Sequence, residues 1–269
     1  MIENKLLEKL LTDIYNLYGY DFTQYSKASL QRRINSFYTK SKITDYAEFL
    51  EKLAYQPYFT NFIEEITVNV TEMFRDPSFY KALKEKVIPV LATYPFIRVW
   101  HAGCSTGEEV YSLAILLKEA GILDKSLLYA TDINESVIKN AKSGIFPIQI
   151  MKNYTENYVS AGGLADFSTY YQANYNLAKF DASLTKRMVF STHNLVSDSS
   201  FNEFQLIICR NVLIYFNQEL QDKVLQLFDK SLEKLGFLAL GSKESLRFST
   251  IAEKYTQIDT KDKLWRKSK

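Results

Sequence analysis

The sequence has few residues of the kinds that bind metals or form disulfide bonds. It contains two cysteines and two histidines in 269 residues. Cys104 and Cys209 lie far apart in the chain and neither belongs to a CxxC pair, which favours a reducing compartment and therefore a cytoplasmic location. No cysteine cluster accompanies His101 or His193, so we expect no zinc site and no other bound metal.

Long hydrophobic runs and a strong net charge are absent from the sequence as well. No segment approaches the roughly 18 uninterrupted apolar residues of a membrane span, and the N-terminal MIENKLLEKLLTD mixes acids and bases among its leucines, unlike a signal peptide. The formal net charge is +2 and there is no long basic stripe, which argues against a nucleic-acid partner. With 46% hydrophobic and 24% charged residues, the composition is that of a globular protein.

The first part of the chain carries the apolar spacing of helices. Four stripes with the helical period lie in residues 6–17, 30–38, 46–53 and 59–66. Asp76 and Pro77 then predict an N-cap followed by proline at the first position of another helix. We therefore predict an all-helical N-terminal domain over residues 1–75 and a connecting helix or linker over residues 76–96.

Strands and helices alternate from residue 97 onward. Strands are predicted at IRVW, SLLYATDI, KRMVFSTHNL, FQLIICRNV and FLALGS, and YTQID with KLWRK predicts a terminal antiparallel hairpin. Helices are predicted at VYSLAILLKEAG, NESVIKNAKSG and NQELQDKVLQLFDKSLEKLG, the last ending at Gly236. Over residues 97–269 this alternation predicts an α/β domain, Rossmann-like, with a mostly parallel sheet and helices on both faces.

One segment interrupts this alternation. Residues 146–180 are rich in tyrosine and phenylalanine and contain Gly162 and Gly163. We interpret the segment as a small antiparallel sheet inserted into the α/β domain.

A glycine turn follows the first predicted strand, in VWHAGCSTGEEVYSLA (residues 99–114). A dinucleotide site usually has G-x-G-x-x-G there, because the glycines let the backbone close around a pyrophosphate. Only Gly103 and Gly107 remain here, and Glu109 would repel a pyrophosphate. S-adenosylmethionine fits better, because it carries a sulfonium, an ammonium group and ribose hydroxyls but no phosphate. Acids in a first helical turn also interact favourably with the helix dipole, so one of Glu108 and Glu109 is expected to be structural, and spacing alone does not say which.

The second predicted strand of the domain ends in ATDIN. This places Asp132 where an acid binds the ribose hydroxyls in adenosine sites. Asp132 could instead cap the helix that begins near Asn134. The two interpretations are about even for this residue alone, and the neighbouring acid-rich turn favours the ribose.

Two further segments combine polar residues in unusual places. TVNVTEMFRDP lies between two predicted helices, and ICRNVLIYF ends a strongly apolar strand, where open α/β sheets build their sites. The candidate residues in these segments are Asn69, Thr71, Arg75, Arg210, Asn211 and Tyr215. The alternative for Arg210 is an edge arginine paired with an acid, which we favour less because Asn211 and Tyr215 lie beside it.

Five motifs together resemble one family. NVTEMFRDP, RVWHAGCSTGEEVYSLA, YATDIN, HNL and ICRNVLIYF, in this order, closely resemble the bacterial chemoreceptor glutamate methyltransferases, the CheR family, and the resemblance extends to the final LWRK. It implies an S-adenosylmethionine-dependent O-methyltransferase that forms glutamate methyl esters on the cytoplasmic domains of chemoreceptors, releases S-adenosylhomocysteine and uses no metal. A monomer is expected.

The resemblance also implies roles for individual residues. Arg75 and Tyr215 correspond to residues at the reaction centre, and Glu109 corresponds to the acid that binds the donor, which leaves Glu108 to the helix terminus. The full set expected to bind the donor is Asn69, Thr71, Arg75, Gly103, Glu109, Asp132, Asn194, Leu195, Arg210 and Asn211, with Asn194 and Leu195 beside the adenine.

Receptor contacts are expected from the helical front end and from the insert. In the family the second helix carries basic residues, here Lys27, Arg32, Arg33 and Lys40, of which we favour Arg33. A solvated helix surface is the alternative for these charges. In some relatives the insert binds a short peptide at the receptor C-terminus, and the sequence does not say whether it does so here. Ser242 and Lys243, in GSKES, depart from the family pattern outside the expected donor contacts.

Three other functions compete with this one. The first is a methyltransferase with another substrate, such as RNA or a small molecule, and the second is a non-catalytic module that binds S-adenosylmethionine in a signalling complex. The third, a nicotinamide-dependent dehydrogenase, is disfavoured by the missing middle glycine and by Glu109.

Overall fold

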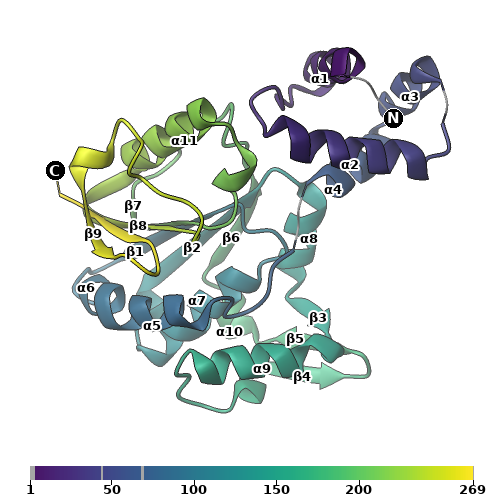
Figure 1. The fold of residues 1–269 in the computed structure, drawn as a ribbon. Coiled ribbons are helices and arrows are strands. Elements are labelled where there is room, and N and C mark those ends of the chain that lie inside the picture. Colours follow the sequence, from purple (N-terminus) through teal and green to yellow (C-terminus); the bar gives the residue numbers. More distant parts are fainter. Residues whose placement is uncertain (1–3, 44, 68–69, 269) are drawn as a thin grey trace.

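The front end of the protein is a small bundle of helices. The computed structural model describes residues 4–43, 45–67 and 70–268. The front helices are α1 (Asn4–Tyr18), α2 (Lys27–Lys40), α3 (Tyr46–Leu53) and α4 (Gln56–Ile66) (Figure 1). Their apolar stripes meet in one core, in which Leu10, Ile34 and Phe49 are fully buried. The predicted all-helical front end is confirmed.

A broken helix leads from the bundle into the second part. It consists of α5 (Pro77–Ala82), a π-helical turn (Leu83–Val87) and α6 (Ile88–Leu91), and its apolar side packs into the core beneath the large sheet. Asp76 and Pro77 occupy the N-cap and the first turn as predicted, but Asp76 does not cap the helix with its side chain. Asp76 has a left-handed backbone (φ 59°) and its side chain makes no capping hydrogen bond. The predicted boundaries at residues 75 and 96 stay predictions.

The second part is built on a mostly parallel sheet. Within the described residues, seven strands lie in the order β6-β2-β1-β7-β8-β10-β9. Strand β10 pairs antiparallel with β8 and β9, and all the other pairs are parallel. Their bounds are β1 Ile97–Ala102, β2 Ser126–Asp132, β6 Met188–Thr192, β7 Phe204–Cys209, β8 Leu232–Leu240, β9 Tyr255–Asp259 and β10 Leu264–Lys267. The predicted Rossmann-like sheet and the terminal hairpin are confirmed.

Helices cover both faces of this sheet. On one face lie α5, α6 and α7 (Glu108–Glu119), and on the other lies α11 (Gln218–Ser231), while α8 (Glu135–Ser143) follows β2 (Figure 1). Alternate side chains of β1 point to opposite faces of the sheet. Val99 packs in the core on the α7 side, and Trp100 packs in the core on the α11 side. The polar turns at the carboxyl ends of the strands are thereby left free to form a site.

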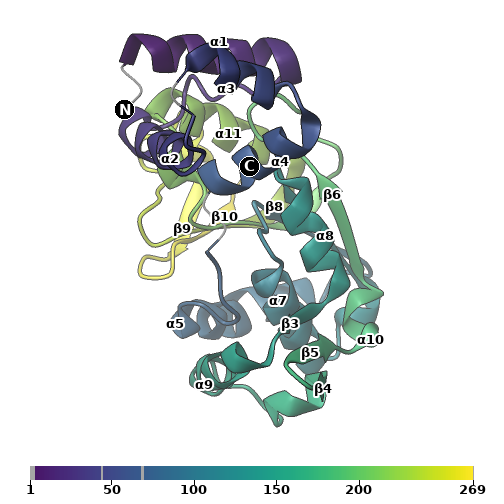
Figure 2. The ribbon, with the colours of Figure 1, turned by 90° about the vertical axis from the view of Figure 1, so that its right-hand side faces the viewer.

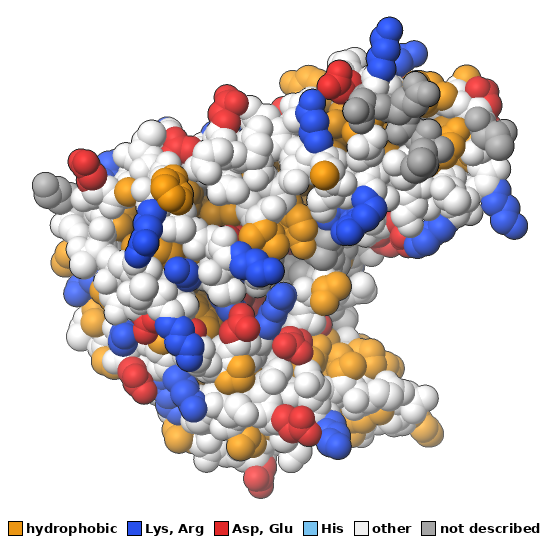
Figure 3. Space-filling view, viewed as in Figure 1, with side chains coloured by type: hydrophobic (Ala, Val, Ile, Leu, Met, Phe, Trp, Pro, Cys, Tyr) orange, Lys and Arg blue, Asp and Glu red, His pale blue; other side chains and the backbone are white. Residues whose placement is uncertain are grey.

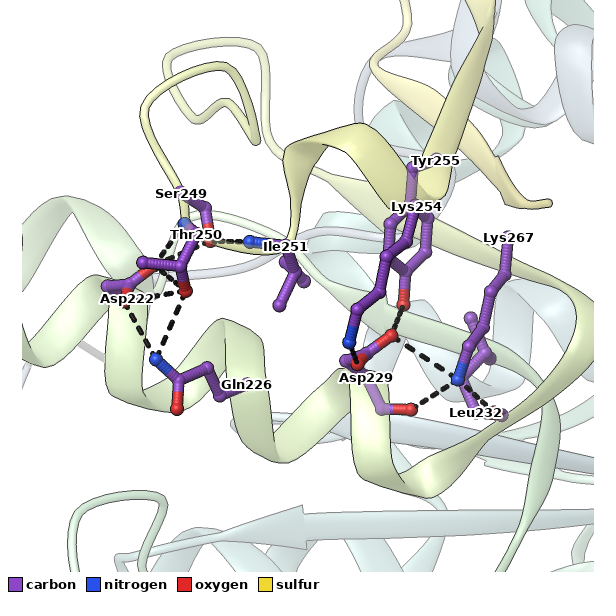
Figure 4. A network of polar contacts seen from close by, with 10 residues as sticks. All are labelled: Asp222, Gln226, Asp229, Leu232, Ser249, Thr250, Ile251, Lys254, Tyr255 and Lys267. Carbon is purple, nitrogen blue, oxygen red and sulfur yellow. Dashed lines mark hydrogen bonds and ion pairs between the residues drawn. The ribbon is translucent and has the colours of Figure 1, made fainter. Parts of the chain in front are cut away.

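The long helix α11 ends earlier than its sequence suggests. It stops at Ser231 rather than at Gly236, and Leu232 already pairs with Phe204 of β7. Lys267 explains the early end, because its ammonium donates to the carbonyls of Asp229 (2.6 Å) and Leu232 (2.9 Å), which a continuing helix would have used (Figure 4).

The insert contains the predicted antiparallel sheet, and also a helix. Strands β3 (Ile145–Pro147), β5 (Leu177–Phe180) and β4 (Tyr171–Asn174) form the sheet in this order. The helix α9 (Met151–Ser160) was not predicted, and α10 (Ala182–Thr185) returns the chain to β6. Figure 2 shows the insert at the end of the molecule opposite the front helices. Among the described residues, no helix has the length and hydrophobicity needed to cross a membrane.

Candidate active site

A cavity lies where the two parts of the protein meet. It opens at the carboxyl ends of β1, β2 and β7, and residues from the front end and from the start of the second part complete its walls. In Figure 3 the molecule is hollowed on one side, between the front helices and the insert. The cavity is lined by most of the residues singled out from the sequence, namely Arg33, Thr71, Arg75, Gly103, Glu109, Asp132, Asn194, Leu195, Arg210, Asn211 and Tyr215. Asn69 lies outside the described residues.

The glycine turn brings two loops of the site into contact. The N–H groups of Gly103 and Cys104 both donate to the carbonyl of Thr131 (2.8 and 2.9 Å), which folds the turn over the end of β2. Gly103 has φ 77°, and a Cβ at this position would lie 2.4 Å from Cγ2 of Val212. The turn after β1 therefore closes against the turn after β7 only because residue 103 has no side chain.

Asp132 faces the cavity from the end of β2. Its carboxylate accepts from the N–H groups of Ser105 (2.9 Å) and Asn134 (3.0 Å). These hydrogen bonds act to lower the pKa of Asp132, but burial has the larger effect and raises it. The alternative role as a helix cap is wrong, because Asn134 is the N-cap of α8 and accepts from the N–H of Ser136 (2.9 Å). A carboxylate has about four acceptor positions, so Asp132 keeps capacity for a ligand.

The two glutamates of the turn have separate surroundings. Glu108 is buried away from the cavity and accepts from the hydroxyls of Thr106 (2.6 Å) and Tyr154 (3.3 Å). Glu109 lines the cavity, with Nδ1 of His101 at 3.4 Å and the guanidinium of Arg210 at 3.1 Å. Burial acts to raise the pKa of Glu109, but hydrogen bonding from His101 and the charge of Arg210 outweigh it, so the pKa is lowered and the side chain is a carboxylate.

Arg210 joins three parts of the site. Its guanidinium pairs with Asp76 (2.6 Å) and Glu109 (3.1 Å), donates to the carbonyl of Arg75 (3.4 Å) and lies 4.0 Å from the ring centre of Phe79. Arg210 is therefore an arginine paired with acids, which is the interpretation that the sequence favoured less. It also lines the cavity. Asp76 was missed as a site residue because its motif was interpreted as a helix start.

The turn after β7 carries Asn211 and Tyr215. Asn211 has a left-handed backbone (φ 62°), and Tyr215 ends the short 3₁₀ turn Leu213–Tyr215. Glu244 was also missed, although it accepts from the N–H groups of Asn211 (3.1 Å) and Ile214 (3.3 Å). It belongs to GSKES, in which the sequence analysis singled out Ser242 and Lys243, because they depart from the family pattern, but not Glu244.

The basic residues of α2 divide into two groups. The guanidinium of Arg33 lies 5.2 Å from the ring centre of Tyr215 and lines the cavity. Arg32 is exposed, while Lys40 pairs with Glu65 (2.7 Å) and Lys27 with Glu8 (3.0 Å) at the surface. Arg33 is thus the member of this group that reaches the candidate active site.

Several polar atoms at the cavity have no hydrogen-bond partner among the residues that the structure describes. They are Nε of Arg33, Oγ of Ser105, Nδ1 of His193 and Nε of Arg210, all buried and all from residues that line the cavity. Five further buried polar atoms of described residues outside the cavity lining also lack a partner, so these four atoms show only that the cavity wall is polar. Within the described residues, no group of three or more His, Cys, Asp or Glu side chains is arranged to hold a metal ion.

Comparison with known proteins gives one consistent result. The family model described as "CheR methyltransferase, SAM binding domain" matches residues 69–263, and "CheR methyltransferase, all-alpha domain" matches residues 5–67. A Pseudomonas putida protein named as a methyltransferase, Cher3, is 46% identical over 260 residues, which are 96% of this chain and 95% of that protein. A chemotaxis protein methyltransferase of Listeria innocua is 33% identical over 231 residues, 85% of each chain. The corresponding protein of Borreliella burgdorferi is 30% identical over 261 residues, 90% of this chain and 88% of its own.

Proposed function

The chain belongs to the CheR methyltransferase family, and from this premise we propose that it methylates glutamate side chains of chemoreceptors. It is an S-adenosylmethionine-dependent methyltransferase with a Rossmann-like catalytic fold. The names of its relatives in Listeria innocua and Borreliella burgdorferi support a role in chemotaxis. The proposed product is a glutamate methyl ester on the cytoplasmic domain of a receptor.

One observation carries this proposal: the carboxylates of Glu109 and Asp132 line the same cavity as Arg33, Arg75 and Tyr215. Glu109 and Asp132 suit a donor that has cationic groups and ribose hydroxyls. The positive charges of Arg33 and Arg75 lie near the Tyr215 hydroxyl and act to lower its pKa. Burial has the larger effect, and the pKa of Tyr215 is raised. An anionic acceptor such as a glutamate carboxylate suits this part of the cavity.

The residues around the cavity fit S-adenosylmethionine, which supplies a methyl group on a positively charged sulfur when bound. Asp132 would accept from the ribose hydroxyls, and the ionised Glu109 would attract the cationic amino-acid end. Asn194 and Leu195 would flank the adenine, with the remaining contacts from Thr71, Arg75, Gly103, Arg210 and Asn211, and from Asn69 outside the described residues.

The protein's contribution to methyl transfer is orientation. A glutamate side chain has a pKa near 4.3, so the acceptor is ionised at pH 7 and needs no general base. Arg33 and Arg75 would hold the acceptor carboxylate in line with the methyl group, and Tyr215 would fix the approach. Holding reacting groups at attack distance contributes several kcal/mol to lowering a barrier.

The two parts of the chain would have different roles, receptor binding and catalysis. We propose that residues 1–75 face the receptor, that residues 76–96 connect, and that residues 97–269 carry out catalysis. Arg33 would act at the reaction centre, whereas the exposed Arg32 and Lys40 would meet the acidic receptor surface. The insert over residues 146–180 would bind a receptor tether peptide where one is present. A cytoplasmic monomer is consistent with this role.

The test is a methyl-ester assay. Purified protein is incubated with radiolabelled S-adenosylmethionine and a receptor cytoplasmic domain, base is added, and volatile methanol is counted, because carboxyl methyl esters are base-labile. We expect released label that is lost in Tyr215→Phe and Arg75→Ala but kept in the surface control Arg187→Ala. Base-stable label would assign the substrate to nitrogen or nucleic acid instead. Donor binding without transfer to any receptor would favour the non-catalytic signalling module.

A further inference from the structure

Glu244 is a buried carboxylate without a cationic partner. Only 5% of its surface is exposed, and no lysine, arginine or histidine among the described residues pairs with it. It does not line the cavity. Removing an ionised carboxylate from water costs several kcal/mol unless other groups compensate, so the groups around Glu244 determine how much of this cost is offset.

Backbone N–H groups from two loops provide part of it, although burial has the larger effect and raises the pKa of Glu244. Oε2 accepts from Gly241 (2.6 Å) and Asn211 (3.1 Å), and Oε1 accepts from Ile214 (3.3 Å). Hydrogen bonds from N–H groups to an ionised carboxylate are about twice as strong as neutral ones. The side chain therefore ties both ends of the turn 211–214 to the loop after β8.

The turn that Glu244 binds begins with a left-handed residue. Asn211 has φ 62°, a backbone conformation that asparagine adopts more readily than most residues with a side chain. The loop after β8 also approaches very closely, since a Cβ on Gly241 would lie 2.8 Å from both the Asn211 nitrogen and Oε2 of Glu244. The backbone of the turn, the backbone at Gly241 and the Glu244 carboxylate are thus in close contact.

This turn carries the residues assigned to the donor and to the reaction centre. Asn211 follows Arg210 directly, and Tyr215 comes one residue after Ile214, whose N–H group Glu244 binds. We propose that Glu244 is a positioning residue that holds Asn211 and Tyr215 in the geometry for donor binding and methyl transfer. The role of these two residues rests on the proposed function, but the test below needs no methyl acceptor.

Glu244→Gln separates positioning from mere stabilisation. The amide keeps the size of the side chain but turns one acceptor oxygen into a donor that faces backbone N–H groups. We expect S-adenosylhomocysteine, titrated by calorimetry, to bind at least tenfold more weakly. We also expect faster hydrogen exchange in a peptide spanning residues 210–216. Because neither measurement needs a methyl acceptor, failure of the methyl-ester assay leaves this result unaffected.

Asp222→Asn is the matched control. Asp222 also accepts from a backbone N–H, that of Thr250 (2.8 Å), and from the hydroxyl of Ser249 (2.6 Å), but it lies on α11 away from the cavity (Figure 4). We expect unchanged affinity and unchanged exchange in residues 210–216. An unchanged affinity or an unchanged turn in Glu244→Gln overturns the proposal. If that variant does not fold, the same two measurements on Glu244→Asp, which keeps the charge on a shorter side chain, decide the matter.

Discussion

Among single residues, Gly103 gives the sharpest prediction. Gly103→Ala adds a Cβ where Cγ2 of Val212 lies 2.4 Å away, on a backbone with φ 77°. Strain and overpacking together should lower the free energy of unfolding by roughly 2–4 kcal/mol. Displacement of the turn should weaken S-adenosylhomocysteine binding at least tenfold. Urea unfolding and calorimetry measure the two effects.

Gly121→Ala separates the two causes. Gly121 has a similar φ of 69°, but nothing lies within 4 Å of the added Cβ. This variant should lose only about 1 kcal/mol of stability and keep the affinity of the parent. If both alanine variants bind equally well, contact with Val212 does not shape the donor site.

Single site residues could be predicted where their neighbours in the sequence define their role. Gly103 follows a strand, Glu109 opens a helix and Asp132 ends a strand, so the local pattern was enough to select them. Asp76 and Glu244 could not be found this way, because the partners that define them lie 134 and 33 residues away along the chain. Only the folded chain shows that Asp76 binds Arg210 and that Glu244 binds the turn after β7.

At the level of helices and strands, the type of each element was easier to predict than its end. The amphipathic pattern of α11 continues toward Gly236, yet the helix stops at Ser231, where Leu232 becomes extended and pairs with β7 and where Lys267 of β10 binds the carbonyls of Asp229 and Leu232. The helix α9 was missed for a different reason. Its buried residues Met151, Tyr154 and Tyr158 lie in an aromatic segment that also suits a strand.

The contact between α11 and the terminal hairpin predicts a pH-dependent stability. Asp229 is buried, and its carboxylate accepts from Lys254 (2.5 Å) and Tyr255 (3.1 Å) and pairs with Lys267 (3.3 Å) (Figure 4). Burial alone would raise the pKa of Asp229, but these partners outweigh it and the pKa is lowered. The unfolded chain therefore binds a proton at a higher pH than the folded one, and the stability from this carboxylate is lost as the pH falls.

Asp229→Asn measures this contribution. At pH 7 we expect the free energy of unfolding to fall by about 1–3 kcal/mol, because the amide loses the charge that binds both lysines. The difference between parent and variant should shrink below about pH 4, near the pKa of an unfolded aspartate. Urea unfolding at pH 7, 4 and 3 tests it, with Glu65→Gln of the exposed pair with Lys40 as control. A difference that stays constant with pH would contradict the assignment.

For the whole molecule, the decisive feature is where the front end attaches. The N–H of Ser26 donates to the carbonyl of Tyr215 (2.8 Å), the N–H of Asn217 donates to the carbonyl of Gln24 (2.9 Å), and Tyr25 and Phe216 form an antiparallel bridge between them. The helical character of the front end could be predicted from its apolar stripes. Its attachment could not, because residues 24–26 and 215–217 carry no pattern that pairs them.

This attachment predicts that disturbing the front end alters methyl transfer. Ser26 has φ −58°, which suits proline, but Ser26→Pro removes the N–H and places a ring carbon against the carbonyl of Tyr215. The two segments must then separate, and Tyr215 and Arg33 lose their relative position. We expect the rate of methyl-ester formation to fall at least fivefold with a loss of roughly 1–3 kcal/mol in unfolding free energy. Ser26→Ala keeps the N–H and should match the parent, since the Ser26 side chain makes no capping hydrogen bond. Equal rates for the proline and alanine variants would mean that the front end recognises the receptor without helping to build the active site.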